Sequence, residues 1–188
     1  MAYFEYFPLT EYQYAGDAYF TQAVNILKRV KVRDTILTQG AFYYLYQVQD
    51  GERPEIIAGK YYGNSGLHWI IMLTNTILDP FFGWPLSVNN LNRYAQQKYG
   101  SGLYDTYGWQ LYSKNPLRNG LWMPSPTVIA GLPISFQEKL YDAGSETINP
   151  VTNYDWETMQ NDAKRQIRLF RPELIPEFVK EFSSLVAS

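Results

Sequence analysis

The spacing of apolar and polar positions changes several times along the chain, and each change predicts a different kind of element. Residues 1–20 are rich in aromatic side chains but sustain neither a helical nor a strand period. From Val24 to Arg33 apolar and polar residues alternate with a period of two, which predicts a half-buried strand. We therefore expect residues 1–40 to form an extended aromatic N-terminal arm followed by a strand.

Residues 41–100 begin with the pattern of a strand followed by a helix. The strand is the aromatic and apolar run Phe42–Val48, which ends at the turn pair Asp50-Gly51. Pro54 suits the first turn of the helix that follows, and Gly63 is placed to cap its end.

Two more helices are predicted before residue 100. The first contains Leu67–Leu73, which is apolar nearly all round, so this helix should be buried on most sides. Asn75 and Asp79-Pro80 close it. The second helix begins after Ser87 and stops at Gly100.

Residues 101–150 differ in composition from the preceding part and contain many Gly, Pro, Ser and Asn residues. Asn119-Gly120 is a strong hairpin turn signal, and Ile134–Tyr141 alternates in the manner of a strand. We therefore expect a β-rich insertion that contains a β-hairpin.

Residues 151–188 return to helical spacing. One apolar stripe runs from Trp156 to Phe170, and a second runs from Phe178 to Leu185, with prolines between them. This pattern predicts a pair of C-terminal helices. Together the four stretches predict an α+β protein with a small β-α-α core.

The composition is rich in aromatic residues and poor in charge. Phe, Trp and Tyr make up 17% of the chain and charged residues 18%, whereas charged residues make up about 25% of an average domain. Such a bias is typical of the cores of protein interfaces. The net charge of −2 argues against a nucleic-acid partner and against a polybasic membrane anchor, which need an excess of Lys and Arg.

The chain has few of the side chains that catalysis and metal binding need. It contains no cysteine and one histidine, His68, which falls within the apolar helix. Asp50, Glu52 and Glu55 form the nearest approach to a catalytic carboxylate cluster. Their place in a turn and a first helical turn is explained by capping and by the helix dipole. We expect no catalytic residue, no cofactor and no metal.

The start of the chain also bears on where the protein is made. Lys28 is the first basic residue, so the positive region of a signal peptide is missing. The run Trp69–Leu73 is too short to span a bilayer. We expect synthesis inside a cell without export.

Surfaces that contact partners are the main functional expectation. A free arm would expose its aromatic residues, so we expect it to lie against a neighbouring subunit; the alternative is that it folds back on its own domain. Trp84 is either core or interface, and the basic residues form either intersubunit ion pairs or solvated faces. The candidate interface residues are Tyr3, Phe4, Tyr6, Phe7, Arg29, Arg53, Trp84, Arg165, Phe178 and Phe182.

The segment Tyr46–Pro80 resembles a LysM-type module, which binds peptidoglycan or chitin oligomers. Such modules have a Tyr-x-Val strand, a turn with Gly, an Ile-Ala helix that ends in Tyr, a Leu-x-Asn and a closing Pro. The matching residues are Tyr46, Val48, Gly51, Ile57, Ala58, Tyr61, Leu73, Asn75 and Pro80.

A wider resemblance covers more of the chain. The motifs DGERPE, KYYG, DPFFGWPLS, KYG and KRQIRLFRPEL, with the helix that contains Trp69, resemble the baseplate wedge protein 53 family of T4-like contractile-tailed bacteriophages. The match is specific from about Tyr43 to Gly100 and weak between Ser101 and Pro150. This resemblance implies an α+β fold with a LysM-like core. The residues expected to be architectural are Asp50, Gly51, Pro54, Tyr61, Gly63, Trp69, Asn75, Asp79 and Pro80.

The family resemblance also implies a function. It implies a structural subunit of the virion tail baseplate, made in the host cytoplasm and present in several copies in a sixfold assembly. Such a subunit would clamp neighbouring wedges and contact the central hub and the sheath-initiator protein, with no nucleic acid and no membrane as partner. The alternative is a LysM-type glycan-binding module.

Overall fold

The computed structural model describes residues 3–13, 16, 19–28, 30, 32 and 40–187. The chain divides into two compact units. The larger unit consists of Met1–Pro85 and Lys164–Ser188, and the smaller unit is Leu86–Ala163. Each unit contains helices and strands, so the predicted α+β class is confirmed.

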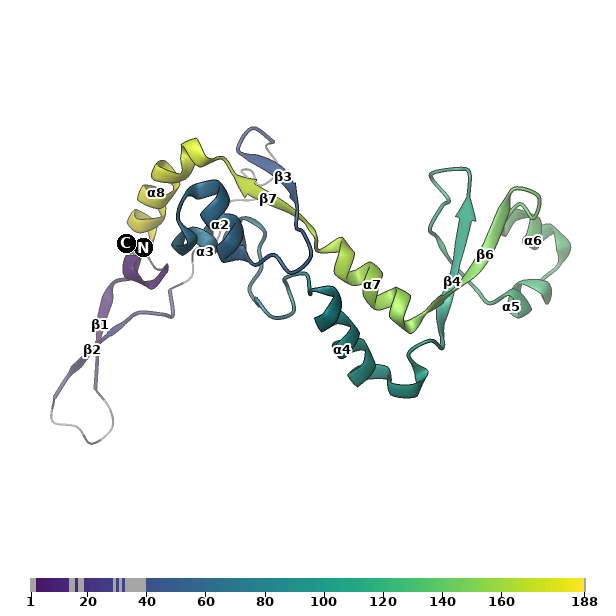
Figure 1. Ribbon diagram of the computed structural model, residues 1–188, viewed down its shortest axis with the longest axis horizontal. Helices are drawn as coiled ribbons and strands as arrows, with labels where there is room; N and C mark the ends of the chain where they lie inside the picture. The colour runs from purple at the N-terminus through teal and green to yellow at the C-terminus, as the bar shows by residue number, and fades with distance from the viewer. Residues whose placement is uncertain are drawn as a thin grey trace. The chain divides into compact units, whose positions relative to one another are not determined.

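The larger unit holds both ends of the chain (Figure 1). Its elements, in chain order, are the 3-10 helix η1 (Tyr3–Tyr6), strands β1 (Leu9–Tyr12), β2 (Thr21–Val24) and β3 (Tyr43–Gln47), helix α2 (Pro54–Tyr62), the 3-10 helix η2 (Ser65–Leu67), helix α3 (His68–Thr74), strand β7 (Gln166–Phe170), the 3-10 helix η4 (Pro172–Leu174) and helix α8 (Ile175–Ala187).

Strands β3 and β7 form a two-stranded antiparallel sheet in which Tyr43 lies opposite Phe170 and Gln47 lies opposite Gln166. The pairing joins segments on either side of the smaller unit in the sequence. Helices α2 and α3 lie beside this sheet (Figure 1). The buried side chains between them form the first core, with members Val48, Ile57, Ala58, Ile71, Trp84, Ile167 and Leu169.

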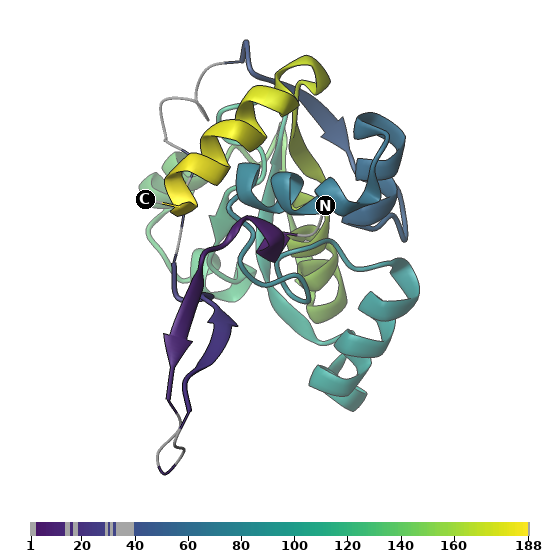
Figure 2. The same ribbon diagram turned by 90° about the vertical axis from the view of Figure 1, so that its left-hand side faces the viewer.

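A second core joins α3 to α8 and to the start of the chain. Trp69 and Ile70 of α3 pack with Phe182 and Val186 of α8, and Phe7 follows η1 into the same cluster. Figures 1 and 2 both show η1 beside one end of α8. Ile175, Phe182 and Val186 of α8 are therefore buried within their own chain, whereas Leu185, the last residue of the predicted stripe, is 52% exposed.

The strand predicted from Val24 to Arg33 is wrong for the described residues. Strand β2 ends at Val24, where the predicted strand begins, and pairs with β1 from Leu9↔Val24 to Tyr12↔Thr21. The carboxamide of Asn25 accepts a hydrogen bond from the Leu27 N–H at 3.2 Å, and this local turn ends the strand. Val30 and Val32 lie outside any strand but pack towards the core.

The smaller unit contains a three-stranded antiparallel sheet with strand order β5-β4-β6. Its elements are helix α4 (Val88–Tyr99), the 3-10 helix η3 (Gly100–Gly102), strands β4 (Thr106–Ser113) and β5 (Trp122–Met123), helices α5 (Pro126–Ala130) and α6 (Ile134–Leu140), strand β6 (Glu146–Thr152) and helix α7 (Asn153–Ala163).

The strand predicted over Ile134–Tyr141 is also wrong, because this segment is helix α6. The carbonyl of Pro133 accepts hydrogen bonds from the N–H groups of Phe136 and Gln137 and so starts the helix. The alternating apolar residues Ile134 and Phe136 are both exposed, so no buried strand face exists to select the other conformation.

The helix predicted from Trp156 to Phe170 is shorter than expected. Helix α7 ends at Ala163, and Gln166–Phe170 is strand β7. Ile167 and Leu169 alternate with polar residues and are buried, and β3 supplies their hydrogen-bond partners. The predicted C-terminal pair therefore corresponds to α7 of the smaller unit and α8 of the larger unit, with β7 between them in the sequence.

Candidate interaction surfaces

Most aromatic candidates of the N-terminal arm lie inside the larger unit. The Trp69 ring lies 5.5 Å from the Tyr3 ring and 5.7 Å from the Tyr6 ring. Phe7 is 6% exposed, whereas Phe4 is 52% exposed at the rim of the cluster. Residues 3–7 thus fold back on their own domain, which is the alternative considered for the arm.

The C-terminal aromatic candidates belong to the same cluster. The ring centroid of Phe182 lies 4.6 Å from that of Trp69, and Phe178 lies 6.1 Å from Trp69. Trp84 is buried in the other core, where its indole N–H donates to the Glu52 carbonyl at 2.8 Å. These three side chains leave little surface for a partner.

The basic candidates differ in their surroundings. Arg53 is largely exposed and pairs with Glu55 at 3.5 Å. Arg165 is largely buried, pairs with Asp50 at 3.3 Å and donates to the carbonyl of Val48. Arg29 lies outside the described residues.

Glu52 organises the loop between β3 and α2. Its carboxylate accepts hydrogen bonds from the Tyr46 hydroxyl at 2.8 Å and the Gln49 N–H at 3.0 Å, and it pairs with Lys60. Burial alone would raise the pKa of Glu52, but these donors together hold that pKa below its usual value. Burial and the bond to Glu52 raise the pKa of Tyr46 to about 12.

The three carboxylates considered for catalysis therefore all have structural partners. Asp50 pairs with Arg165, Glu55 pairs with Arg53, and Glu52 closes its loop. The arrangement stabilises the connection from β3 to α2. The pattern of charges in the sequence does not reveal the role of Glu52. That role depends on Tyr46 of β3 and Lys60 of α2, which only the fold brings together.

Several residues expected to be architectural act on the backbone. Gly51 and Gly63 have φ values of 72° and 68°, a conformation that favours glycine, and Gly63 ends α2. Pro54 occupies the first turn of α2. Tyr61 packs edge-on against Tyr46 with ring centroids 5.2 Å apart.

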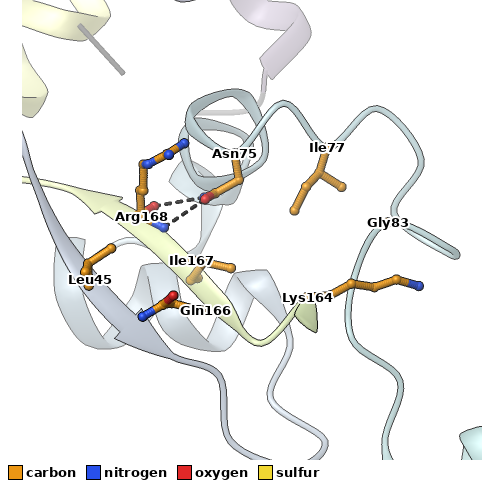
Figure 3. Close-up of a pocket in the computed structure, with 8 residues that line it drawn as sticks. All are labelled: Leu45, Asn75, Ile77, Gly83, Lys164, Gln166, Ile167 and Arg168. Atoms are coloured by element: carbon orange, nitrogen blue, oxygen red, sulfur yellow. Dashed lines mark hydrogen bonds between the residues drawn. The ribbon is translucent and has the colours of Figure 1, made fainter. Parts of the chain in front are cut away.

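Asn75 fastens the end of α3 to β7. Its amide group donates to the carbonyls of Ile71 and Arg168, and its side-chain oxygen accepts from the Arg168 N–H at 2.8 Å. Figure 3 shows the two bonds to Arg168 as dashed lines. The side chain thus pairs with the outer edge of β7 as a neighbouring strand would.

The loop after Asn75 exposes three large apolar side chains. We call Ile77–Phe82 the apolar loop; in it Leu78, Phe81 and Phe82 are 91%, 78% and 65% exposed. Isolated exposed apolar residues are ordinary, but three within five positions are typical of a contact surface. The apolar residues of this loop follow neither a helical nor a strand period. The sequence therefore gives no signal that separates these exposed side chains from core residues.

The apolar loop is held in place by hydrogen bonds. The carboxylate of Asp79 accepts from the Phe81 N–H at 2.8 Å, and its carbonyl accepts from the Gly83 N–H at 2.8 Å. The Lys164 ammonium donates to the Phe82 carbonyl at 2.8 Å. A Cβ on Gly83 would lie 2.6 Å from the Asp79 carbonyl oxygen, so a glycine is required there. Pro80 completes the turn.

A pocket of about 330 Å³ lies between the apolar loop and strand β7 (Figure 3). This volume is at the lower end of the range for small-molecule sites. Lys164 and Arg168 are its charged lining residues, and none of its lining residues is acidic. Its lining residues are Leu45, Asn75, Ile77, Gly83, Lys164, Gln166, Ile167 and Arg168.

The smaller unit carries an aromatic stack at its surface, formed by Tyr107, Trp122 and Trp156. The rings of Tyr107 and Trp156 stack with centroids 4.4 Å apart, and Trp122 lies edge-on to Trp156 at 5.3 Å. Tyr107 is 48% and Trp122 is 44% exposed. Partly exposed, preorganised Trp and Tyr side chains are typical of the residues that dominate binding energy.

Helices α4 and α7 of the smaller unit are joined by a buried carboxylate. Glu157 accepts hydrogen bonds from Lys98 at 2.7 Å and from the Tyr99 hydroxyl at 2.8 Å. Asn161 adds bonds to both backbone groups of Leu86. These hydrogen bonds hold α7 against α4 and against the backbone at the start of the smaller unit.

The described part of the chain lacks the features of two further classes of site. There, no group of three His, Cys, Asp or Glu side chains is placed to hold a metal ion. No described helix has both the length and the apolar content needed to cross a membrane. The surfaces with apolar or aromatic side chains are the prominent features.

Comparison with known proteins identifies the family of the chain. The model of the family described as Base plate wedge protein 53 matches residues 2–104, which is more than half of the chain. The baseplate wedge protein gp53 of Enterobacteria phage T4 is 22% identical over 136 residues, which cover 72% of this chain and 69% of that protein. The chain therefore belongs to the base plate wedge protein 53 family and is a structural component of the bacteriophage tail baseplate, where it associates with other baseplate components.

Proposed function

We propose that the chain clamps neighbouring wedges of the baseplate together, with contacts to the central hub and the sheath-initiator protein. Several copies would act in a sixfold assembly, after synthesis in the host cytoplasm. The observation that carries this proposal is that each of the two compact units has its own surface of exposed apolar or aromatic side chains.

A protein that joins two neighbours needs at least two binding surfaces. The apolar loop of the larger unit supplies Leu78, Phe81 and Phe82, and the aromatic stack of the smaller unit supplies Tyr107 and Trp122. Both sets are held by contacts within their own unit. A surface that is already ordered loses little conformational entropy when it binds.

The expected energies are large enough to decide assembly. Full burial of a Phe side chain contributes about 1.5–3 kcal/mol. Since about 1.4 kcal/mol changes an affinity tenfold, loss of Phe81 and Phe82 together should weaken that contact by about a hundredfold or more. Loss of one surface should leave the contact made by the other intact.

The proposal predicts that single-surface variants bind one wedge without linking two. Wedges would be reconstituted from the other wedge proteins of the same phage, and linked particles would be counted by electron microscopy. Phe81→Ser with Phe82→Ser removes one surface, and Trp122→Ser removes the other. We expect either variant to lower the yield of linked wedges at least about tenfold while one wedge stays bound.

The matched control is Gln97→Ser, at an exposed polar position of α4. It should assemble like the unchanged chain. Circular dichroism would confirm that each variant is folded. If both surface variants link wedges as well as the control, the clamp proposal is wrong.

A LysM-type glycan-binding module is the second candidate. The order β3, α2, α3 and β7, with the two strands antiparallel, supports a LysM-like scaffold. The second strand of this scaffold comes after the smaller unit in the sequence. Trp69 and Trp84 are buried, so they cannot stack directly on a sugar.

Calorimetric titration of the full chain with chitin oligomers would distinguish the two functions. If the clamp proposal is right, no saturable heat should appear at micromolar sugar. Saturable binding that Lys164→Ala in the pocket reduces would favour the glycan module instead.

A further inference from the structure

Strand β3 has one edge that pairs with no described strand. Among the described residues it pairs with β7 on one side and with nothing on the other. The Val48 N–H donates to the Arg165 carbonyl, and the Arg171 N–H donates to the Phe42 carbonyl. Because antiparallel pairing alternates with a period of two, Tyr44 and Tyr46 also bond towards β7.

The remaining residues of β3 direct their backbone groups away from β7. These are Tyr43, Leu45 and Gln47. Arg168 lies opposite Leu45, and both of its backbone groups bond to Asn75 instead of to β3. The backbone groups of Leu45 therefore have no partner in β7. The Gln49 side chain donates to the Gln47 carbonyl at 3.0 Å. In the described part of the chain, no hydrogen bond satisfies the outward N–H and C=O groups of Tyr43 and Leu45.

The open edge lacks the features that usually prevent pairing. Tyr43–Gln47 contains no charged residue, no proline and no bulge, and Leu45 is 66% exposed. In the smaller unit, by contrast, edge strand β5 has only two residues, and edge strand β6 contains Glu146 and Pro150. An unprotected edge in an assembly subunit is typical of a strand that a partner covers.

Two arginines on the β7 side of the sheet reach over tyrosine rings of β3, and their charge indicates the chemistry of the partner. The Arg168 guanidinium lies 5.4 Å from the Tyr43 ring centroid, and the Arg171 guanidinium lies 4.7 Å from the Tyr44 ring centroid. Neither arginine forms an ion pair with a described residue. An incoming carboxylate would therefore meet guanidinium groups that lack acidic partners.

We propose that β3 accepts, as a third strand of its sheet, an extended acidic segment of another baseplate protein. The outward groups of Tyr43 and Leu45 repeat at the spacing of a strand, so an extended polypeptide is the ligand that matches them. Pairing with β3 of a second copy would bring four arginines without acidic partners into one sheet, which disfavours that occupant.

This inference rests on membership of the baseplate and not on the clamp function, so its test is separate. Leu45→Pro removes an outward N–H while leaving every bond from β3 to β7 in place. We expect the full chain to keep its melting temperature and to lose at least about tenfold in affinity for the reconstituted wedge. Leu45→Thr keeps the N–H and should bind within about threefold of the unchanged chain.

The two neighbouring positions provide the internal control. Tyr44→Pro removes an N–H that bonds to β7, so it should lower the melting temperature, unlike Leu45→Pro. Hydrogen exchange adds a second readout that needs no variant. In the isolated chain the Tyr44 and Tyr46 amides should be protected and the Leu45 amide should exchange fast; in the assembled baseplate all three should be protected.

Photo-crosslinking from position 45 identifies the occupant. With p-benzoylphenylalanine in place of Leu45, we expect crosslinks in the baseplate to one segment of another protein that contains Asp or Glu. The same probe at Gln97 sets the background. Crosslinks to a second copy or within the same chain, or a yield at background, would overturn the proposal. If Leu45→Pro assembles normally while the single-surface variants fail to link wedges, the clamp stands and the edge proposal fails.

Discussion

Replacing Trp69 by alanine should lower the free energy of unfolding of the full chain by about 3–5 kcal/mol, as for other buried Trp-to-Ala changes. Trp69 lies at the centre of the cluster in which η1, α3 and α8 meet, with Phe182 at 4.6 Å and Tyr3 at 5.5 Å. Its loss would leave a cavity that rings from three separate segments cannot all move to fill. Urea unfolding followed by circular dichroism measures the change.

Two matched variants make this result specific. Trp69→Phe keeps a ring in the site and removes an indole N–H that has no hydrogen-bond partner among the described residues, so it should cost much less. Phe4→Ala removes an exposed ring from the rim and should change the free energy of unfolding by about 0.5 kcal/mol or less. Equal losses for Trp69→Ala and Phe4→Ala would contradict the packing described for this cluster.

Replacing Glu52 by leucine should lower the free energy of unfolding by about 2 kcal/mol, because the change leaves two partly buried donors without their acceptor. Those donors are the Tyr46 hydroxyl and the Gln49 N–H. Lys60, which also loses its partner, is more than half exposed and can return to water at little cost. Thermal and urea unfolding near neutral pH measure the loss.

The same carboxylate predicts a dependence on acid pH. The pKa of Glu52 is lowered in the folded chain, so the unfolded state binds a proton more readily than the folded state does. The stability due to Glu52 is therefore complete above the unfolded pKa of about 4.3 and is lost as the pH falls through the folded pKa. Unfolding midpoints measured between neutral pH and pH 3 should fall less for Glu52→Gln than for the unchanged chain. Parallel pH curves for the two would contradict this assignment.

The sequence pattern predicts well those elements that local chemistry determines. Pro54 and Gly63 mark the first turn and the end of α2, and the φ of 68° at Gly63 explains why that position suits glycine. Ser87 caps α4 by accepting from the Asn90 N–H. The motifs around residues 50–100 also identify the family correctly, since the family model covers residues 2–104.

The elements that depend on distant partners are not predictable in this way. Ile167 and Leu169 fit both a strand face and the end of a helical stripe, and β3, which decides between them, lies before the smaller unit in the sequence. Ile134 and Phe136 alternate as a strand would, but no strand of the described part of the chain pairs with this segment, and both side chains are exposed. The spacing of apolar residues alone does not decide between helix and strand in these two segments.

The candidate interface residues show the same limit. Composition identifies a chain that is unusually rich in aromatic residues, but it cannot separate Phe7 and Phe182, which are buried, from Phe81 and Phe82, which are exposed. Phe7 and Phe182 are buried by packing against Trp69, a contact between segments far apart in the sequence. Phe81 and Phe82 lie in a turn that Asp79 and Gly83 hold by local hydrogen bonds.

The placement of β7 after the smaller unit has a consequence for biosynthesis. While the ribosome is still translating residues 86–163, β3 has emerged but its strand partner has not yet been made. Domains generally fold as units during translation, so the smaller unit can fold while the larger one waits for the last part of the chain. A polypeptide released before β7 is made would expose both edges of β3. We expect proteases to degrade such a truncated chain before it can be incorporated into a baseplate.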